Sequence, residues 1–506
     1  MLHNMPLRRF LLPLAFVSVG LSACAGSPTA PPTEPPPPVS TGGDTVPPVI
    51  SREMRGVWIA TVANIDWPTR TALSVAQQQA ELIDLFDRAN AAGLNAVMFH
   101  VRPAADAVYQ SALEPWAALL TGVQGQDPGY DPLAFAVREA HARGLELHAW
   151  INPFRAGNSK DSALLAASHV FKARRDLARV YGSQIWLDPG EPAVHDRSIN
   201  VVRDIIERYD VDGVHADDYF YPYQENDAAG KLIDFPDSGS YARSGSMLSR
   251  ADWRRNNVDR FVERLYGEVH RIKPTLKVGI SPFGIWRPGN PVGVNGLDAF
   301  ASIYADSRKW LQQGWVDYLA PQLYWSIAAP QQSYPALFDW WLAQNPMGRH
   351  VWPGLAAYRV TDGTASAFTA AEIPNQITMT RARAGGTGHI LYNANSTLKK
   401  FSGAIASSLA PLYSARALTP AFAWLDAVPP AAPSFTVAGR TMQILPGAGD
   451  AARWWVIRSR SSATWTTRLV FGDVRTYTLG ETPDRVVVNA VDQSGNLSAN
   501  AAWKTP

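Results

Sequence analysis

The chain has 506 residues, of which 46% are hydrophobic and 18% charged, so it is long enough for two folded domains with sizeable cores. Its formal net charge of +2 is too small to gather polyanions, which excludes nucleic acid as an expected partner. The only cysteine is Cys24, so an intrachain disulfide is excluded and stability must come from the hydrophobic core.

The first 23 residues are typical of a bacterial export signal. Arg8 and Arg9 precede the apolar run FLLPLAFVSVGLSA, which is too short to span a bilayer comfortably. The run ends in LSAC, which resembles a lipoprotein cleavage site. Residues 1–23 are therefore predicted to be removed and Cys24 to carry lipid. An ordinary signal peptide followed by a chance cysteine is the alternative.

Removing this signal leaves 44 basic and 44 acidic side chains, so the mature protein is predicted to be neutral. Ala25 follows the cysteine, and a residue of this kind at this position resembles the sorting signal that directs lipoproteins to the outer membrane. The expected location is therefore the cell envelope, with a lipid anchor in the periplasmic face of the outer membrane. Residues 24–49 are rich in proline and predict an extended linker, whose reach is on the order of 75 Å.

Eight short apolar runs follow, separated by segments with helical periodicity. They lie at residues 55–62, 95–101, 145–151, 212–220, 276–284, 316–325, 350–359 and 388–397. Alternating strands and helices over this length predict an α/β fold, a (β/α)8 barrel of the TIM type. A doubly wound open sheet is the structural alternative, but no glycine-rich phosphate loop follows the first strand.

The barrel is predicted to occupy residues 50–425, with its last strand–helix unit ending near residue 415. The segment VPPAAPSF is a proline-rich boundary, and beyond it strands and turns alternate. Residues 430–506 therefore predict a small all-β sandwich of the fibronectin type III kind.

Polar and aromatic residues gather where the predicted barrel strands end, which is where barrels of this kind carry their active sites. Carboxylates, amides and aromatic rings together suit a sugar, because pyranose faces stack on rings and two acids catalyse cleavage. Alternatively, many of these rings fill barrel layers. The candidate sugar-binding residues are Asp66, Trp67, His100, Arg102, Trp116, Trp150, Asn152, His215, Tyr219, Trp286, Asp306, Gln322, Tyr324, Trp325, Tyr358 and Asn393.

The segment DGVHADDYF concentrates carboxylates at the end of the fourth strand. Because strand side chains alternate, His215, Asp217 and Tyr219 should face the barrel interior. Asp217 then points into the cleft, with Asp218 beside it at the rim. Two adjacent acids repel, so the pKa of one of them rises unless Arg102 or Arg155 neutralises the pair. Asp218 as a loop-capping carboxylate is the alternative.

Seven motifs in order resemble the glycosyl hydrolase-like family 10 between about residues 50 and 415. They include RGVWIATVANIDWP, EAHARGLELHAWINPFR, YDVDGVHADDYFYPY, GISPFGIWR and GHILYNANSTL. The resemblance implies a barrel glycosidase that cleaves peptidoglycan glycan strands, preferably those without stem peptides. The lipoprotein cleavage site LSAC and the fibronectin-like tail are similar to those of family members found at the cell-division site. This similarity implies cell-division proteins as partners.

The spacing in DGVHAD is also similar to the fourth strand of α-amylases and chitinases. The resemblance implies that Asp217 is the nucleophile or an electrostatic stabiliser. The second acid of those families is missing, since Tyr219 stands where chitinases have glutamate and GISPFGIWR contains no glutamate. Candidates for the general acid are Glu114 first, then Asp218, Asp306 and Asp66. Asp306 is equally well interpreted as a helix N-terminal residue.

No metal site or cofactor is expected. His100, His148 and His215 lie on different strands, where packed and hydrogen-bonded histidines are the common case. Two rival functions remain open: hydrolysis of an exopolysaccharide such as poly-N-acetylglucosamine, and non-catalytic binding of envelope glycan.

Overall fold

The computed structural model describes residues 46–504 apart from 361–362 and 365–366. The predicted export signal, lipidated Cys24 and nearly all of the predicted linker lie outside the described residues. Residues 47–506 form one compact unit. Among the helices in the described part of the chain, none combines the length and apolar character needed to cross a bilayer.

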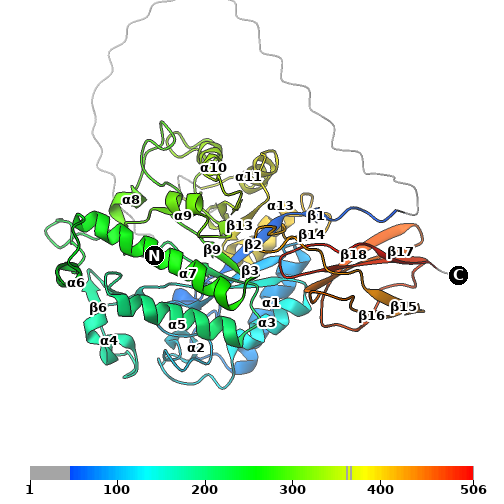
Figure 1. Cartoon of the computed structure of the whole chain (residues 1–506), viewed down its shortest axis with the longest axis horizontal. Coiled ribbons are helices and arrows are strands. Elements are labelled where there is room, and N and C mark those ends of the chain that lie inside the picture. The colour runs from blue at the N-terminus through cyan, green and yellow to red at the C-terminus, as the bar shows by residue number, and fades with distance from the viewer. Residues whose placement is uncertain (1–45, 361–362, 365–366, 505–506) are drawn as a thin grey trace, which may run out of the picture. The chain divides into compact units, whose positions relative to one another are not determined.

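Nine parallel strands form the central sheet (Figure 1). In sheet order they are β11 (His350–Val351), β10 (Tyr318–Leu319), β9 (Lys277–Ile280), β8 (Gly213–Ala216), β4 (Glu146–Ile151), β3 (Ala96–Arg102), β2 (Met54–Ile59), β13 (Gly388–Tyr392) and β12 (Gly354–Ala356). Each of the eight predicted apolar runs overlaps at least one of these strands.

The sheet closes on itself through Trp352 and Pro353, the two residues that separate β11 from β12. β11 pairs with β10 on one side, and β12 pairs with β13 on the other. The two short strands are thus one interrupted seventh strand of an eight-stranded barrel. The predicted (β/α)8 fold is confirmed, and the open doubly wound sheet is excluded.

Helices follow the strands and cover the outside of the sheet (Figure 1). The longer ones are α1 (Val75–Ala91), α3 (Pro132–Ala142), α5 (Pro192–Arg208), α7 (Arg250–Ile272), α10 (Tyr334–Ala343), α11 (Glu372–Arg381) and α13 (Lys400–Leu409). The shorter ones are α2 (Ala118–Thr121), α4 (Val170–Ala173), α6 (Ser238–Ser244), α8 (Ala299–Ser302), α9 (Ser307–Gln313) and α12 (Ala394–Leu398), with 3-10 turns η1 (Val62–Asn64), η2 (Arg175–Leu177) and η3 (Ala357–Arg359). A short antiparallel sheet of β5 (Arg155–Gly157), β7 (Gln184–Leu187) and β6 (Ala178–Tyr181) is inserted after β4.

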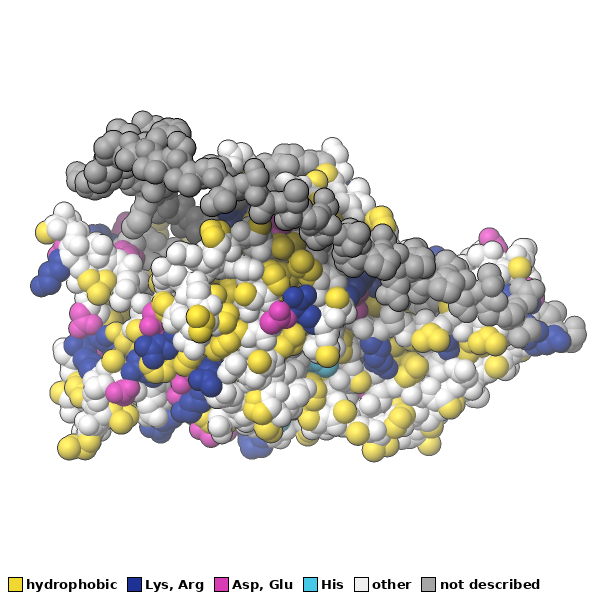
Figure 2. Space-filling view, turned by 90° about the horizontal axis from the view of Figure 1, so that it is seen from above, with side chains coloured by type: hydrophobic (Ala, Val, Ile, Leu, Met, Phe, Trp, Pro, Cys, Tyr) yellow, Lys and Arg dark blue, Asp and Glu magenta, His cyan; other side chains and the backbone are white. Residues whose placement is uncertain are grey.

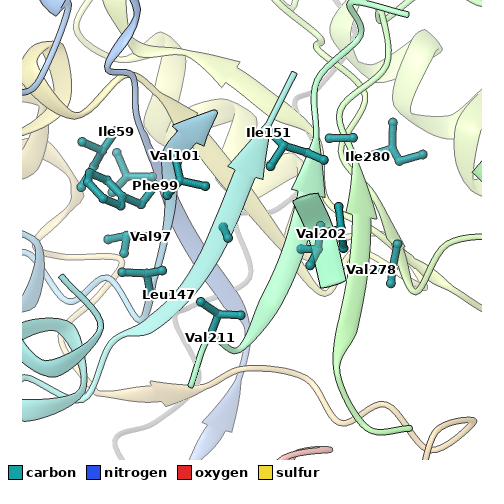
Figure 3. Close-up of a cluster of buried hydrophobic side chains, with 14 of the residues drawn as sticks. Ile59, Val97, Phe99, Val101, Leu147, Ile151, Val202, Val211, Val278 and Ile280 are labelled. Atoms are coloured by element: carbon teal, nitrogen blue, oxygen red, sulfur yellow. The ribbon is translucent and has the colours of Figure 1, made fainter. Parts of the chain in front are cut away.

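The strand side chains divide between two cores, as the two-residue period requires. One set packs against the helices; it includes Val97, Phe99, Val214 and Val278 (Figure 3). The other set fills the barrel interior: Met54, Trp58, Met98, Trp150, Tyr318 and Ile390. Val214 and Ala216 belong to the outer core, so His215 between them points inward, as predicted.

The C-terminal residues form two antiparallel sheets around a shared apolar core. One contains β15 (Ser434–Ala438), β16 (Thr441–Leu445) and β19 (Thr476–Thr478); the other contains β18 (Thr464–Phe471), β17 (Trp454–Ser461), β20 (Arg485–Val491) and β21 (Ala501–Lys504). Met442, Ile444, Trp455 and Val488 fill the core. This arrangement agrees with the predicted small all-β fold.

Residues 417–425 connect the two parts and close the amino-terminal end of the barrel. β14 (Ala417–Leu418) pairs with β1 (Ser51–Arg52). Phe422 packs in the barrel-interior cluster, and Trp424 donates a hydrogen bond to Asp317 over 2.8 Å. The helical layer ends at Leu409, but the barrel core is complete only when this connector is in place.

Arg453 ties the C-terminal sheets to the barrel. Its Nε donates to Asp212 over 2.7 Å and its Nη1 to Asp210 over 2.6 Å. Asp212 is fully buried and also accepts the backbone N–H of Leu147 over 2.8 Å. Burial disfavours the charge of Asp212, but Arg453 and His141 hold its pKa below the ordinary range. Asp210 and Asp212 are thus structural anchors at the end opposite the mouth.

On the face seen in Figure 2, basic and acidic side chains are interspersed without a large area of one sign. This distribution agrees with the near-zero net charge and offers no track for a polyanion on that face.

We expect Arg453→Met to lower the free energy of unfolding by about 3–5 kcal/mol, because it leaves the buried Asp212 carboxylate without its cation. Urea unfolding would measure the loss. Arg264→Met is the matched control, since the Arg264–Asp196 pair is solvent-exposed and should contribute less than about 1 kcal/mol. Equal losses for the two variants would contradict this account, and Asp212→Asn should rescue part of the Arg453→Met loss.

Candidate active site

Asp217 and Asp218 follow β8 directly and lie in the mouth of the barrel, 8% and 3% exposed. Oδ1 of Asp217 accepts two hydrogen bonds: the backbone N–H of Asp218 at 2.9 Å and Nε2 of Gln322 at 3.3 Å. Gln322 also donates to the carbonyl of Ser281 over 3.0 Å. Since both donors occupy Oδ1, a proton carried by Asp217 sits on Oδ2.

The two carboxyl groups have different surroundings, and these shift their pKa values to different extents. Burial, the neighbouring charge of Asp218 and a hydrogen bond between the two side chains raise the pKa of Asp217 well above its ordinary value. Burial also raises the pKa of Asp218, but the hydroxyl of Tyr223 donates to its Oδ2 and favours the charged form. Asp217 is therefore the member of the pair whose protonated form is favoured more strongly.

Neither predicted arginine forms an ion pair with these carboxylates among the described residues. Arg102 is fully buried in its own ion pair. The guanidinium carbon of Arg155 lies 3.7 Å from the ring centroid of Tyr219. From there its charge only partly offsets the rise in the pKa of Asp217.

Aromatic rings surround the pair. Tyr324 lies 5.8 Å from Tyr392 and 5.9 Å from Tyr358 between ring centroids. Tyr219 contacts Tyr223, which in turn contacts Phe283, and Phe283 contacts Trp325. Burial raises the pKa of Tyr324, with smaller effects from its neighbours, which include both aspartates. Of the predicted residues, Gln322 contacts Asp217 directly, and Tyr324 and Tyr219 lie close enough for the aspartate charges to act on them. Tyr358 and Trp325 are linked to the pair only through other rings.

Glu114 lies elsewhere, which contradicts its prediction as general acid. Its carboxylate is fully buried and paired with Arg102 through bonds of 2.6 and 2.8 Å, and Arg197 approaches to 3.3 Å. Burial opposes the charge, but these cations lower the pKa of Glu114. A permanently ionised and enclosed carboxylate donates no proton. For the same reason Arg102 is closed to sugar hydroxyls.

Asp66 and Asp306 bind the protein's own backbone. Asp66 accepts the N–H groups of Ala60 and Asn395 over 2.7 Å each, and Nδ2 of Asn393 over 2.8 Å. Burial raises its pKa to about 7. Asp306 caps α9 and accepts the indole N–H of Trp286 over 2.9 Å, in agreement with its helix N-terminal interpretation.

The remaining predicted aromatic and polar residues have different surroundings. Trp67 is fully buried and donates to the carbonyl of Gln78, so its prediction as a stacking platform is wrong. Trp116, Trp286 and Trp325 are partly exposed. His100 stacks on Trp150 at 3.9 Å between ring centroids inside the barrel. Asn152 is buried and donates to the carbonyl of Pro103.

Sequence reasoning assigned no role to three groups that complete the site: Tyr223, Ser281 and Trp58. Tyr223 lies five residues after Asp218 in the motif YDVDGVHADDYFYPY, so its nearness was a usable signal. Trp58 lies on β2 and Ser281 directly follows β9, and they contact His215 at 3.1 and 2.9 Å. Only the strand order brings them together.

Comparison with known proteins agrees with this geometry. A family model described as glycosyl hydrolase-like 10 matches residues 53–369. The glycosyl hydrolase YngK of Bacillus subtilis is 41% identical over 397 residues, which cover 76% of each chain. The glycosyl hydrolase DigH of Escherichia coli K12 is 35% identical over 370 residues, 69% of this chain and 83% of the relative.

Among solved structures, the glycoside hydrolase domain of PgaB from Bordetella bronchiseptica aligns with a TM-score of 0.47 and 13% identity, over 73% of this chain and 100% of that one. From the match over most of the barrel and the two close relatives, it follows that the chain belongs to the glycosyl hydrolase-like 10 family and is a glycoside hydrolase.

Proposed function

We propose that this glycoside hydrolase cleaves glycans of N-acetylated amino sugars, and that its substrate is the peptidoglycan strand without stem peptides. The observation that carries the proposal is the contact between the two acids. Asp217 and Asp218 are consecutive residues, the backbone N–H of Asp218 donates to Asp217, and the charge of Asp218 acts on Asp217, so they cannot flank a glycosidic bond from opposite faces. A covalent retaining mechanism needs carboxyl groups about 5–5.5 Å apart, and inversion needs about 6.5–9.5 Å.

A nucleophile supplied by the substrate fits this pair. Oδ2 of Asp217 gives its proton to the glycosidic oxygen while the acetamido oxygen of the same sugar attacks C1. The C1–oxygen bond to the leaving sugar breaks, and a cyclic oxazolinium ion forms. The carboxylate of Asp218 stabilises its positive charge. Water then adds to C1, one of its protons returns to Asp217, and the acetamido group is restored.

This assignment reverses the roles that the sequence suggested, since Asp217 becomes the acid and Asp218 the stabiliser. The burial of Asp217 and its contact with Asp218 support the exchange. The rings of Tyr324, Tyr358 and Tyr392 offer apolar faces for the sugar.

The location belongs to the same proposal. A lipid on Cys24 and the proline-rich residues 24–49 would tether the barrel to the periplasmic face of the outer membrane, within reach of the cell wall. The neutral mature chain suits a glycan from which charged peptides have been removed. Cell-division proteins are the partners that would supply such denuded strands. Poly-N-acetylglucosamine carries the same acetamido group and is the second candidate substrate.

We expect the protein to release fragments from purified sacculi only after amidase treatment, as read by mass spectrometry. Asp217→Asn should lower the rate roughly 10²–10⁴-fold, which is the usual contribution of a general acid. Asp196→Asn changes an exposed carboxylate on α5. It is the matched control and should keep full activity. If no glycan is cleaved although sacculus binding persists, the protein is a non-catalytic glycan-binding lipoprotein and the proposal fails. Cleavage of poly-N-acetylglucosamine alone would instead select the second substrate.

A thiazoline analogue of N-acetylglucosamine, which mimics the cyclic intermediate, should inhibit competitively. It should bind at least tenfold more tightly than N-acetylglucosamine itself, because it matches a species formed only during reaction. Competition assays on denuded glycan would measure both constants. Equal affinities would argue against the acetamido nucleophile while leaving the glycosidase activity intact.

The pH profile of kcat/KM should be bell-shaped, because activity needs Asp217 protonated and Asp218 ionised. Asp218→Asn removes the charge that raises the pKa of Asp217, so the alkaline limb should move to lower pH. Tyr223→Phe removes a donor to the ionised Asp218, so the pKa of Asp218 rises and the acid limb should move to higher pH. Tyr241→Phe, which removes a hydroxyl that donates to the carbonyl of Leu248, should leave both limbs in place.

A further inference from the structure

A file of buried polar side chains runs through the barrel interior beneath Asp217. Trp58 Nε1 lies 3.1 Å from His215 Nε2, and Ser281 Oγ lies 2.9 Å from the same nitrogen. His215 Nδ1 lies 3.0 Å from the hydroxyl of Tyr318, which lies 2.8 Å from His148 Nδ1. His148 Nε2 then meets Glu146 at 3.2 Å. All of these residues are at most 3% exposed.

The two ends of the file fix its direction. The indole of Trp58 can only donate a hydrogen bond. Glu146 is paired with Lys277 over 2.7 Å and accepts the hydroxyl of Thr419 over 2.7 Å. Although burial disfavours its charge, Lys277 lowers the pKa of Glu146. Glu146 is therefore an ionised carboxylate that can only accept.

Every group between these ends can both donate and accept a hydrogen bond. Because one end can only donate and the other can only accept, only one arrangement of the hydrogen bonds is consistent. His148 donates from Nε2 to Glu146, and its Nδ1 accepts the hydroxyl of Tyr318. The oxygen of Tyr318 accepts Nδ1–H of His215. His215 Nε2 is left bare: its single lone pair accepts the indole N–H of Trp58, and the hydroxyl of Ser281 lies against the same nitrogen. The two histidines thus hold opposite tautomers, and every hydrogen bond points toward Glu146.

The upper end of the file reaches the acid. His215 lies on β8 and precedes Asp217, which follows the strand, by two residues. Ser281 binds His215 through its hydroxyl, and its carbonyl accepts Gln322, which donates to Asp217 Oδ1. Protonating His215 would bring an N–H against the N–H of Trp58 and place a positive charge beneath the acid. Burial and His148 lower the pKa of His215 well below its ordinary value, in agreement with a neutral ring.

We propose that Trp58, His215 and Tyr318 are positioning residues, which form a one-way hydrogen-bonded chain that keeps the floor beneath Asp217 uncharged and holds Ser281 and Gln322 against it. This inference rests on the proposed role of Asp217 as the acid. The inference also explains why these polar side chains lie within an otherwise apolar barrel interior.

The first test needs no substrate. Nitrogen NMR of histidine rings in the full-length chain should show the ring proton of His215 on Nδ1 and that of His148 on Nε2. Assignment comes from the loss of each signal in His215→Gln and His148→Gln. Matching tautomers, or a charged His215, would overturn the proposed direction of the chain.

The second test removes the middle of the chain. Tyr318→Phe should shift the side-chain amide resonance of Gln322 and lower kcat on amidase-treated glycan about tenfold, with KM changed less than about twofold, since a transition-state interaction is weakened rather than binding. Tyr334→Phe is the matched control: it also removes a buried hydroxyl, which binds Thr380 behind the barrel, and should change neither readout.

The amide resonance separates this inference from the proposed function. If the protein cleaves no glycan but the Gln322 signal moves in Tyr318→Phe alone, the positioning chain stands and the substrate assignment fails. If Tyr318→Phe and Tyr334→Phe behave alike in both readouts, the chain is only part of the core and the inference fails.

Discussion

The closed barrel imposes one constraint on everything at its centre: inward side chains meet no bulk water. An unpaired buried donor or acceptor is costly there, which favours partners among the inward side chains of other strands, although the ring nitrogens of His100 and the indole nitrogen of Trp150 have none among the described residues. Pairing His215 with Tyr318 and Tyr318 with His148 meets this requirement across three strands. The same exclusion of water raises the pKa of Asp217, since its charged form would lose hydration. The exclusion of water thus explains both the hydrogen-bonded side chains in the interior and the raised pKa of Asp217.

The fold followed closely from the sequence, and the inward direction of His215 followed from strand alternation alone. Local patterns sufficed because strands and helices are set by neighbouring residues. They could not show that Trp352 and Pro353 divide the seventh strand, since the division depends on hydrogen bonds to two different neighbours.

The site was harder to predict because its partners are remote in sequence. Glu114 looked like a loop acid, yet the loop folds back and pairs it with Arg102, twelve residues earlier. Trp67 looked like a sugar platform, yet the same ring fills the core, and an apolar ring gives no local sign of which it does. The adjacency of Asp217 and Asp218 was visible in the sequence, whereas the difference between their surroundings came from Tyr223 and Gln322.

The connector at residues 417–425 has a consequence for how the molecule is made. Thr419 reaches Glu146, and Phe422 and Trp424 seal the barrel's amino-terminal end, while Arg453 neutralises Asp212. A chain synthesised from its amino terminus therefore has all of its strands long before it has its seal. Until residue 453 has emerged, Asp212 lacks the arginine that neutralises it. Segments that follow the last barrel strand in the chain thus complete the barrel.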